Sequence, residues 1–161
     1  MTIVNVYMYN STEYVEHGHG FRCERCFRVL VANSTFEGLQ AYAGGAIALI
    51  EMAGSMSKIV NNTFRNNQAG IGGAIKLENP ATVNIKGNNF TGNSAIKIEK
   101  NWRRADGGAI YYSCSPKYTE TQTDCEVSLH ENRFENNTAL NKGGAARWVN
   151  KNFTFQVSDV Q

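Results

Sequence analysis

The stretch Phe64-Arg65-Asn66-Asn67-Gln68-Ala69-Gly70-Ile71-Gly72-Gly73-Ala74-Ile75, residues 64–75, decides the fold of this chain. It joins two short motifs, Phe-x-x-Asn and Gly-Gly-Ala-Ile, and both motifs recur along the sequence. A motif that returns at a period of 20–50 residues is the sequence signature of solenoids and related repeat arrays. The repeat is therefore the first feature that the fold has to explain.

Four copies of this pattern are visible. The aromatic landmark stands at Phe36, Phe64, Phe90 and Phe134. The Gly-Gly-Ala that follows each of them stands at residues 44–46, 72–74, 107–109 and 143–145. The intervals between the Phe residues are 28, 26 and 44 residues, and the long last interval holds two insertions, 97–106 and 114–125. Regular copies with insertions confined to particular corners predict a solenoid.

The segments between the landmarks have the period of strands. Val83-Asn84-Ile85-Lys86 and Val127-Ser128-Leu129-His130 alternate apolar and polar residues, as in a strand with one buried face. No stretch sustains a helical period, and the copies hold too few Leu for a leucine-rich repeat. Fifteen Gly and nineteen Asn, against two Pro, suit many tight corners. The sequence predicts an all-β, right-handed parallel β-helix of the pectin-lyase type, with about four to six rungs of about three strands each.

We expect residues 1–161 to form one such domain, either part of a longer solenoid or a subunit that stacks. Within it, 1–30 is expected to be an irregular first rung and 31–150 the repeat rungs. The start of the chain has neither the basic nor the apolar region of a signal peptide, so a secretion signal is expected to lie outside it. The longest apolar run, residues 46–53, is interrupted by Glu51 and is too short to span a bilayer.

The motif also predicts what lies inside the coil. The four Phe residues are expected to stack on successive rungs, and each Gly-Gly pair to form a corner with positive φ and no room for a side chain. The residue three places after Phe is Leu39 in the first copy and Asn67, Asn93 or Asn137 in the others. We expect these three Asn to form an internal hydrogen-bonded ladder; the alternative is that they are solvent-facing turn residues.

The paired motifs resemble the repeats of the chlamydial polymorphic membrane proteins, and they look equally like those of large β-helical surface proteins of ciliates. The resemblance spans about residues 33–150 and is strongest at Phe64–Asn67 with Gly72–Ile75, and at Phe134–Ala145. It implies a secreted or cell-surface location and a structural or adhesive role.

Six sequons fit an extracellular location, at Asn10, Asn33, Asn61, Asn89, Asn136 and Asn152. Chance would give roughly two or three in a chain of this composition. Asn33 and Asn61 hold equivalent places in consecutive rungs, so N-linked glycans there would form a row. The alternative is that an Asn-rich repeat generates bare sequons by accident.

The four cysteines also fit that location. Cys114 and Cys125 bracket a polar insertion, and we expect a disulfide between them. Cys23 and Cys26 are expected to form a tight disulfide or to belong to the irregular first rung. A metal site with His17 and His19 is the alternative, although its spacing is short for zinc.

The net charge and the placement of the acidic residues restrict the classes of function that we expect. The net charge is +2, and the sixteen Lys and Arg residues form no basic stripe, so no nucleic-acid partner is expected. The acids are three Asp and eleven Glu in scattered registers, whereas β-helical lyases and hydrolases need clustered carboxylates. We expect no catalytic residues, no cofactor and no metal.

The predicted function is that of an extracellular or cell-surface structural glycoprotein, a non-catalytic β-helix building block. We expect it to pair with copies of itself or with further rungs of a parent chain, end to end, in a filament or coat. An adhesin or glycan- or protein-binding module is the alternative, and a polysaccharide lyase or hydrolase ranks third.

Overall fold

The computed structural model describes residues 1–9, 15–54, 56–98, 104–115, 125–149 and 154–158. Over these residues the chain is all β, with twenty-one short strands and no helix. The strands form four sheets, named A to D here, and every strand pairing is parallel. No helix of this part of the chain is long and apolar enough to cross a bilayer.

The strand bounds follow sheet by sheet. Sheet A holds β1 (Thr2–Val4), β5 (Leu30–Ala32), β9 (Ser57–Val60), β13 (Thr82–Lys86), β17 (Glu126–His130) and β21 (Thr154–Ser158). Sheet B holds β2 (Tyr7–Tyr9), β6 (Thr35–Glu37), β10 (Thr63–Arg65), β14 (Asn89–Thr91) and β18 (Arg133–Glu135). Sheet C holds β3 (Val15–His17), β7 (Gln40–Ala43), β11 (Gln68–Ile71), β15 (Ser94–Ala95) and β19 (Thr138–Ala139). Sheet D holds β4 (Phe21–Glu24), β8 (Ile47–Ile50), β12 (Ile75–Glu78), β16 (Ile110–Ser113) and β20 (Ala146–Val149).

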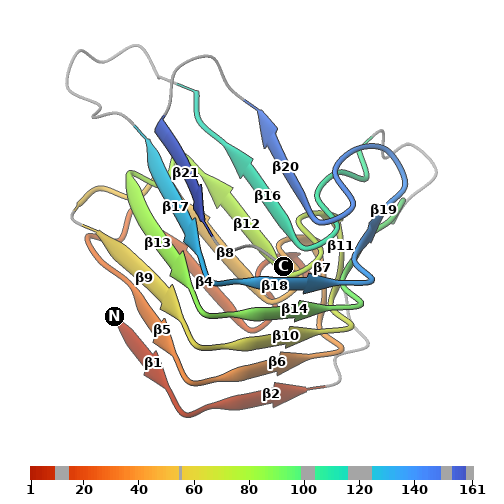
Figure 1. The fold of residues 1–161 in the computed structure, drawn as a ribbon, viewed down its shortest axis with the longest axis horizontal. Helices are drawn as coiled ribbons and strands as arrows, with labels where there is room; N and C mark the ends of the chain where they lie inside the picture. Colours follow the sequence, from red (N-terminus) through yellow and green to blue (C-terminus); the bar gives the residue numbers. More distant parts are fainter. Residues whose placement is uncertain (10–14, 55, 99–103, 116–124, 150–153, 159–161) are drawn as a thin grey trace.

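The chain visits the sheets in the order A, B, C, D and then returns to A, so neighbours within a sheet differ by four in strand number. Within the described residues this gives five complete rungs, and β21 begins a sixth. Figure 1 shows the successive strands of sheets A and B rising as parallel steps from β1 and β2. The predicted parallel β-helix is confirmed.

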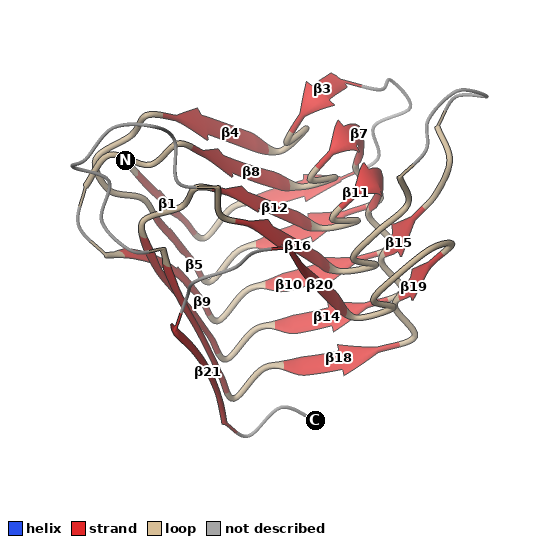
Figure 2. Ribbon diagram, turned by 90° about the horizontal axis from the view of Figure 1, so that it is seen from above, coloured by secondary structure: helices blue, strands red, loops and turns tan. Residues whose placement is uncertain are grey.

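Each rung has four strands, and the expectation of about three was wrong. The extra corner lies inside the Phe-x-x-Asn motif, where φ is positive at Gly38, Asn66, Gly92 and Asn136. Residues in that left-handed region turn the chain sharply, so the motif is split between sheets B and C. Figure 2 shows sheets A, B and D bounding the interior, with sheet C at one side.

The Gly-Gly corner lies between sheets C and D. The first glycine of each pair has positive φ, between 62° and 69° for Gly44, Gly72, Gly107 and Gly143. The second lies against the next rung, because a Cβ on Gly45, Gly73 or Gly108 would meet the carbonyl oxygen of the second glycine of the following pair. This corner explains why the pair recurs: one glycine supplies the turn and the other lets the rungs approach.

Both predicted insertions fall between strands. Residues 97–106 lie between β15 and β16, and residues 114–125 lie between β16 and β17. Residues 99–103 and 116–124 of these insertions lie outside the described part of the chain. Residues 1–30 contribute β1 to β4, each paired in parallel with its counterpart in the second rung.

Candidate functional site

The interior of the solenoid carries the first group of predicted residues, the four phenylalanines. Their rings stack face to face, with centroids 5.1 Å apart for Phe36 and Phe64, 4.9 Å for Phe64 and Phe90, and 4.8 Å for Phe90 and Phe134. The interplanar angles are 6° to 7°. The first three Phe are fully buried, whereas Phe134 in the fifth rung is only partly buried. The stack therefore runs through four rungs and opens at one end.

The three asparagines after this stack form a hydrogen-bonded column, which we call the first Asn ladder. Asn67 Nδ2 donates to the carbonyl oxygen of Phe36 at 3.0 Å and to Asn93 Oδ1 at 3.0 Å. Its Oδ1 accepts from the backbone N–H of Leu39 at 3.0 Å. Asn93 repeats these bonds with Phe64 and Asn137. Asn67 and Asn93 are completely buried, so the ladder satisfies backbone groups of the neighbouring rung in the interior, in addition to the backbone bonds between rungs at this corner.

A second Asn ladder, which sequence reasoning missed, lies at the corner between sheets A and B. It consists of Asn62, Asn88 and Asn132, all at most 2% exposed. Asn62 Nδ2 donates to Asn88 Oδ1, and Asn88 Nδ2 donates to Asn132 Oδ1, both at 3.0 Å. The available signal was an Asn two places before Phe in three copies. Ser34 holds the same place in the first copy, and its N–H donates to Asn62 Oδ1 at 3.0 Å.

The described sequons lie at corners and on an outer face. Asn33 and Asn61 occupy the same corner of consecutive rungs, with φ of 51° and 55°, and both are exposed. Asn136 is exposed at the next corner, between β18 and β19. Asn89 lies in β14 and is half-buried. Asn10 and Asn152 lie outside the described residues.

Both cysteine pairs form disulfides. Cys114 and Cys125 close the insertion between β16 and β17, as predicted. Cys23 at the end of sheet D bonds to Cys26, which was one of the two structures expected for that pair. Because these sulfurs are bonded to each other, they do not act as thiolate ligands beside His17 and His19. Within the described residues, no three His, Cys, Asp or Glu side chains are placed to hold a metal ion.

His17, Tyr111 and Tyr112 have shifted pKa values, and burial is the largest cause of each shift. The pKa of His17 is lowered by burial first, then by the charge of Lys76. The pKa of Tyr111 is raised, again by burial first. Burial also raises the pKa of Tyr112, in the core, to about 12.

The carboxylates of the outer faces lie beside cations. On sheet B, Arg65 contacts Glu37 at 2.6 Å and Arg133 contacts Glu135 at 2.8 Å. Tyr7 also donates to Glu37, and the hydrogen bond from Arg65 is the main reason why the pKa of Glu37 is lowered. On sheet D, Arg22 contacts Glu24 and Lys76 contacts Glu78. A lowered pKa keeps the Glu37 carboxylate ionised beside Arg65, so this group acts as an ion-pair partner on the outer face of sheet B.

Comparison with known proteins identifies one stretch of the repeat. Residues 89–113 match the family model of the Chlamydia polymorphic membrane protein repeat. This stretch runs from β14 through β15 to β16, and includes the third Phe and the third Gly-Gly pair. The predicted resemblance to the chlamydial repeat is therefore confirmed over these residues. No curated protein and no solved structure matches the chain.

Proposed function

We propose that this chain is a non-catalytic building block of an extracellular or cell-surface solenoid, whose open ends are covered by further rungs. The observation that carries the proposal is the state of those ends. Strands β1 to β4 and strands β18 to β21 each have a neighbour on one side only within the described residues. Open parallel edges present unpaired N–H and C=O groups and favour the addition of another strand.

The core is also incompletely covered at the end formed by the fifth rung. Phe134, Ala146 and Trp148 of the fifth rung occupy the columns of buried residues, yet they are only partly buried. Asn137, the last member of the first ladder, is likewise only half-buried. Another rung would cover this apolar surface and pair these edges, either from the same parent chain or from a second copy.

The surface location rests on three observations of different kinds. Residues 89–113 match a repeat of membrane proteins, two disulfides are present, and three sequons lie at exposed corners. Disulfides persist in oxidising compartments. If the chain passes through a secretory pathway that attaches N-linked glycans, Asn33, Asn61 and Asn136 are the acceptors that the fold presents best.

The stacking proposal is tested by electron microscopy and sedimentation of the purified protein over a range of concentrations. We expect elongated particles whose length grows with concentration. Trp148→Lys places a charge at the open end and is expected to leave single particles, whereas Arg133→Ala, on the outer face of β18, is expected to stack as the unsubstituted protein does. Circular dichroism checks that each variant keeps its β structure.

Two results would overturn end-to-end stacking of copies and leave rungs of a parent chain as the cover of the ends: single particles at every concentration, or equal assembly of the Trp148→Lys variant. The glycan proposal is tested separately by peptide mass spectrometry of protein made in a host that attaches N-linked glycans. Unmodified Asn33, Asn61 and Asn136 in that material would contradict it.

A further inference from the structure

The outer face of sheet D repeats a pairing of a cation with a carboxylate two residues later. In the first rung Arg22 contacts Glu24 at 2.7 Å, and in the third rung Lys76 contacts Glu78 at 2.6 Å. Residues two apart on a strand point to the same side, so each pair lies flat on this face. The register of sheet D aligns Arg22, Ala48, Lys76, Tyr111 and Arg147 in one column, which we call the cation column. It aligns Glu24, Ile50, Glu78, Ser113 and Val149 in a second, which we call the carboxylate column. The first and third rungs have both charges, and the second and fourth rungs have neither.

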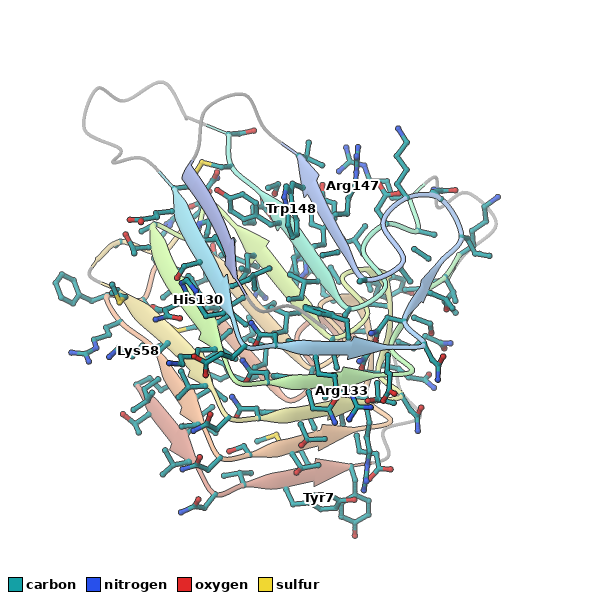
Figure 3. The ribbon with its side chains drawn as sticks, viewed as in Figure 1. Tyr7, Lys58, His130, Arg133, Arg147 and Trp148 are labelled. Atoms are coloured by element: carbon teal, nitrogen blue, oxygen red, sulfur yellow. A yellow bond between two sulfur atoms is a disulfide. The ribbon has the colours of Figure 1, made fainter. Side chains whose placement is uncertain are left out.

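The fifth rung has the cation without its carboxylate. Arg147 stands in the cation column, next to Tyr111 of the fourth rung. In the carboxylate column, however, the fourth and fifth rungs have Ser113 and Val149. Arg147 Nε is buried and has no hydrogen-bond partner. Figure 3 shows Arg147 on β20, at the upper part of the molecule.

Other side chains around Arg147 are also incompletely paired. Asp106 Oδ1 is also buried without a hydrogen-bond partner. Asp106 forms an isolated parallel bridge with Lys142 of the next rung, just before the Gly-Gly corner. Arg104 donates to the hydroxyl of Tyr111 at 3.4 Å. Tyr111 pairs with Arg147 in the register of sheet D, and the charges of Arg104, Asp106, Arg147 and Glu78 all influence its pKa. Arg104, Lys142 and Arg147 therefore share this area with two carboxylates, Asp106 and Glu78, of which Glu78 already pairs with Lys76.

We propose that Arg147, Arg104 and Tyr111 bind the anionic group of an acidic sugar, a carboxylate or sulfate that takes the place of the absent glutamate. A guanidinium binds planar oxyanions with several hydrogen bonds, which suits both groups. The unpaired oxygen of Asp106 accepts from a donor, and the hydroxyl groups of a sugar are donors. An acidic sugar carries its hydroxyl donors on the same ring as its anionic group, so one ligand can supply the anion for Arg147 and the donor for Asp106.

The site can be tested by supplying the missing carboxylate within the protein. Val149→Glu recreates on the fifth rung the spacing of Arg22 with Glu24, and it is expected to compete with the ligand for Arg147. The control is Val149→Gln, which introduces a side chain of the same size as Glu but without its charge. Val149 is 39% exposed, so both variants are expected to fold. Arg147→Gln removes the proposed ligand-binding group itself.

The probes are an oligogalacturonate, which carries carboxylates, and a heparin-derived oligosaccharide, which carries sulfates as well. A neutral maltooligosaccharide, inorganic sulfate and a poly-glutamate peptide are the comparisons. Calorimetric titration at low salt is expected to show binding of at least one acidic oligosaccharide. Val149→Glu and Arg147→Gln are expected to weaken it about tenfold or more, and Val149→Gln to leave it within about twofold.

Several outcomes would overturn the proposal. One is the absence of binding to both acidic oligosaccharides; another is equal binding by the Val149→Glu variant. Binding of inorganic sulfate alone would show a simple anion site, and stronger binding of the poly-glutamate peptide would show a site for acidic protein segments. Because β20 is also an edge at which a further rung is proposed to pair, the titrations are made at concentrations where sedimentation shows single particles.

Discussion

At the scale of single residues, the buried asparagines stabilise the coil through hydrogen bonds to the backbone. Each ladder Asn uses its amide to satisfy backbone groups of the neighbouring rung, as Asn67 does for Leu39 and Phe36. A buried amide is tolerated only when its hydrogen bonds are complete, and loss of one member leaves several groups unpaired at once. The ladder therefore selects Asn at that position over any apolar residue of similar size.

Asn67→Ala is expected to lower the free energy of unfolding by about 3 kcal/mol, because it leaves the N–H of Leu39 and the carbonyl of Phe36 unpaired in the interior. The matched control is Asn89→Ala, on the outer face of β14, which is expected to change stability by less than about 0.5 kcal/mol. Denaturant unfolding of the two variants measures the difference. Equal midpoints would mean that water satisfies the ladder positions.

Tyr112 gives a prediction about alkaline pH. Its pKa in the folded protein is about 12, raised by burial from 10.0. Above pH 10 the unfolded chain loses the phenol proton while the folded chain keeps it, so the unfolded state binds fewer protons and stability falls as pH rises. The loss is at most about 3 kcal/mol between pH 10 and pH 12. Denaturant midpoints from pH 8 to pH 12 should show it, and Tyr112→Phe should flatten the slope. An unchanged slope would assign the fall to other groups.

At the scale of elements, the two disulfides close loops of different length and should differ in effect. Cys114 and Cys125 are 11 residues apart, and Cys23 and Cys26 are 3 apart. On the chain-entropy model the longer loop is worth about 3 kcal/mol and the shorter about 1.5 kcal/mol.

We therefore compare two variants, one with Ser at both Cys114 and Cys125 and one with Ser at both Cys23 and Cys26. The first is expected to lose more stability, and thermal unfolding under non-reducing conditions measures which variant unfolds at the lower temperature. The reverse order would show that the short bridge protects the edge strand β4 by more than loop closure.

The elements also show how far the sequence can be interpreted. The parallel β-helix followed from the spacing of Phe and Gly-Gly, because any residue that recurs once per rung must occupy one station of the coil. The number of strands per rung did not follow. Gly, Asn and Glu all occupy left-handed corners here, as at Gly87, Asn61 and Glu131, so no single residue type marks a corner in a sequence.

The same reasoning explains the site residues that were found and missed. The first Asn ladder is visible because its members follow Phe at a constant distance. The second ladder was hidden, since Asn62, Asn88 and Asn132 each stand next to other Asn or polar corner residues. The buried Nε of Arg147 without a partner cannot be found from the sequence. The comparison of Val149 with Glu24 and Glu78 likewise needs the register of sheet D.

At the scale of the whole molecule, a solenoid is stabilised mainly by contacts between neighbouring rungs, so a residue's importance depends on whether a rung lies beyond it. The second glycine of each corner pair shows this directly. A Cβ on Gly73 would meet the carbonyl of Gly108 and lie 2.7 Å from both N and O of Ser94. A Cβ on Gly144 would meet only the carbonyl oxygen of Asn137, at 3.2 Å.

The two alanine substitutions should therefore differ, and the difference reports on stacking. Gly73→Ala forces two rungs apart and is expected to cost about 3 kcal/mol of stability, measured by denaturant unfolding. Gly144→Ala is expected to cost less than about 1 kcal/mol in the single solenoid, yet to block the addition of a rung at that end. In sedimentation at high concentration, Gly144→Ala should then remain a single particle while the unsubstituted protein elongates. If Gly144→Ala elongates equally well, the contact at this end does not repeat the rung-to-rung packing seen within the molecule, and another surface must join the copies.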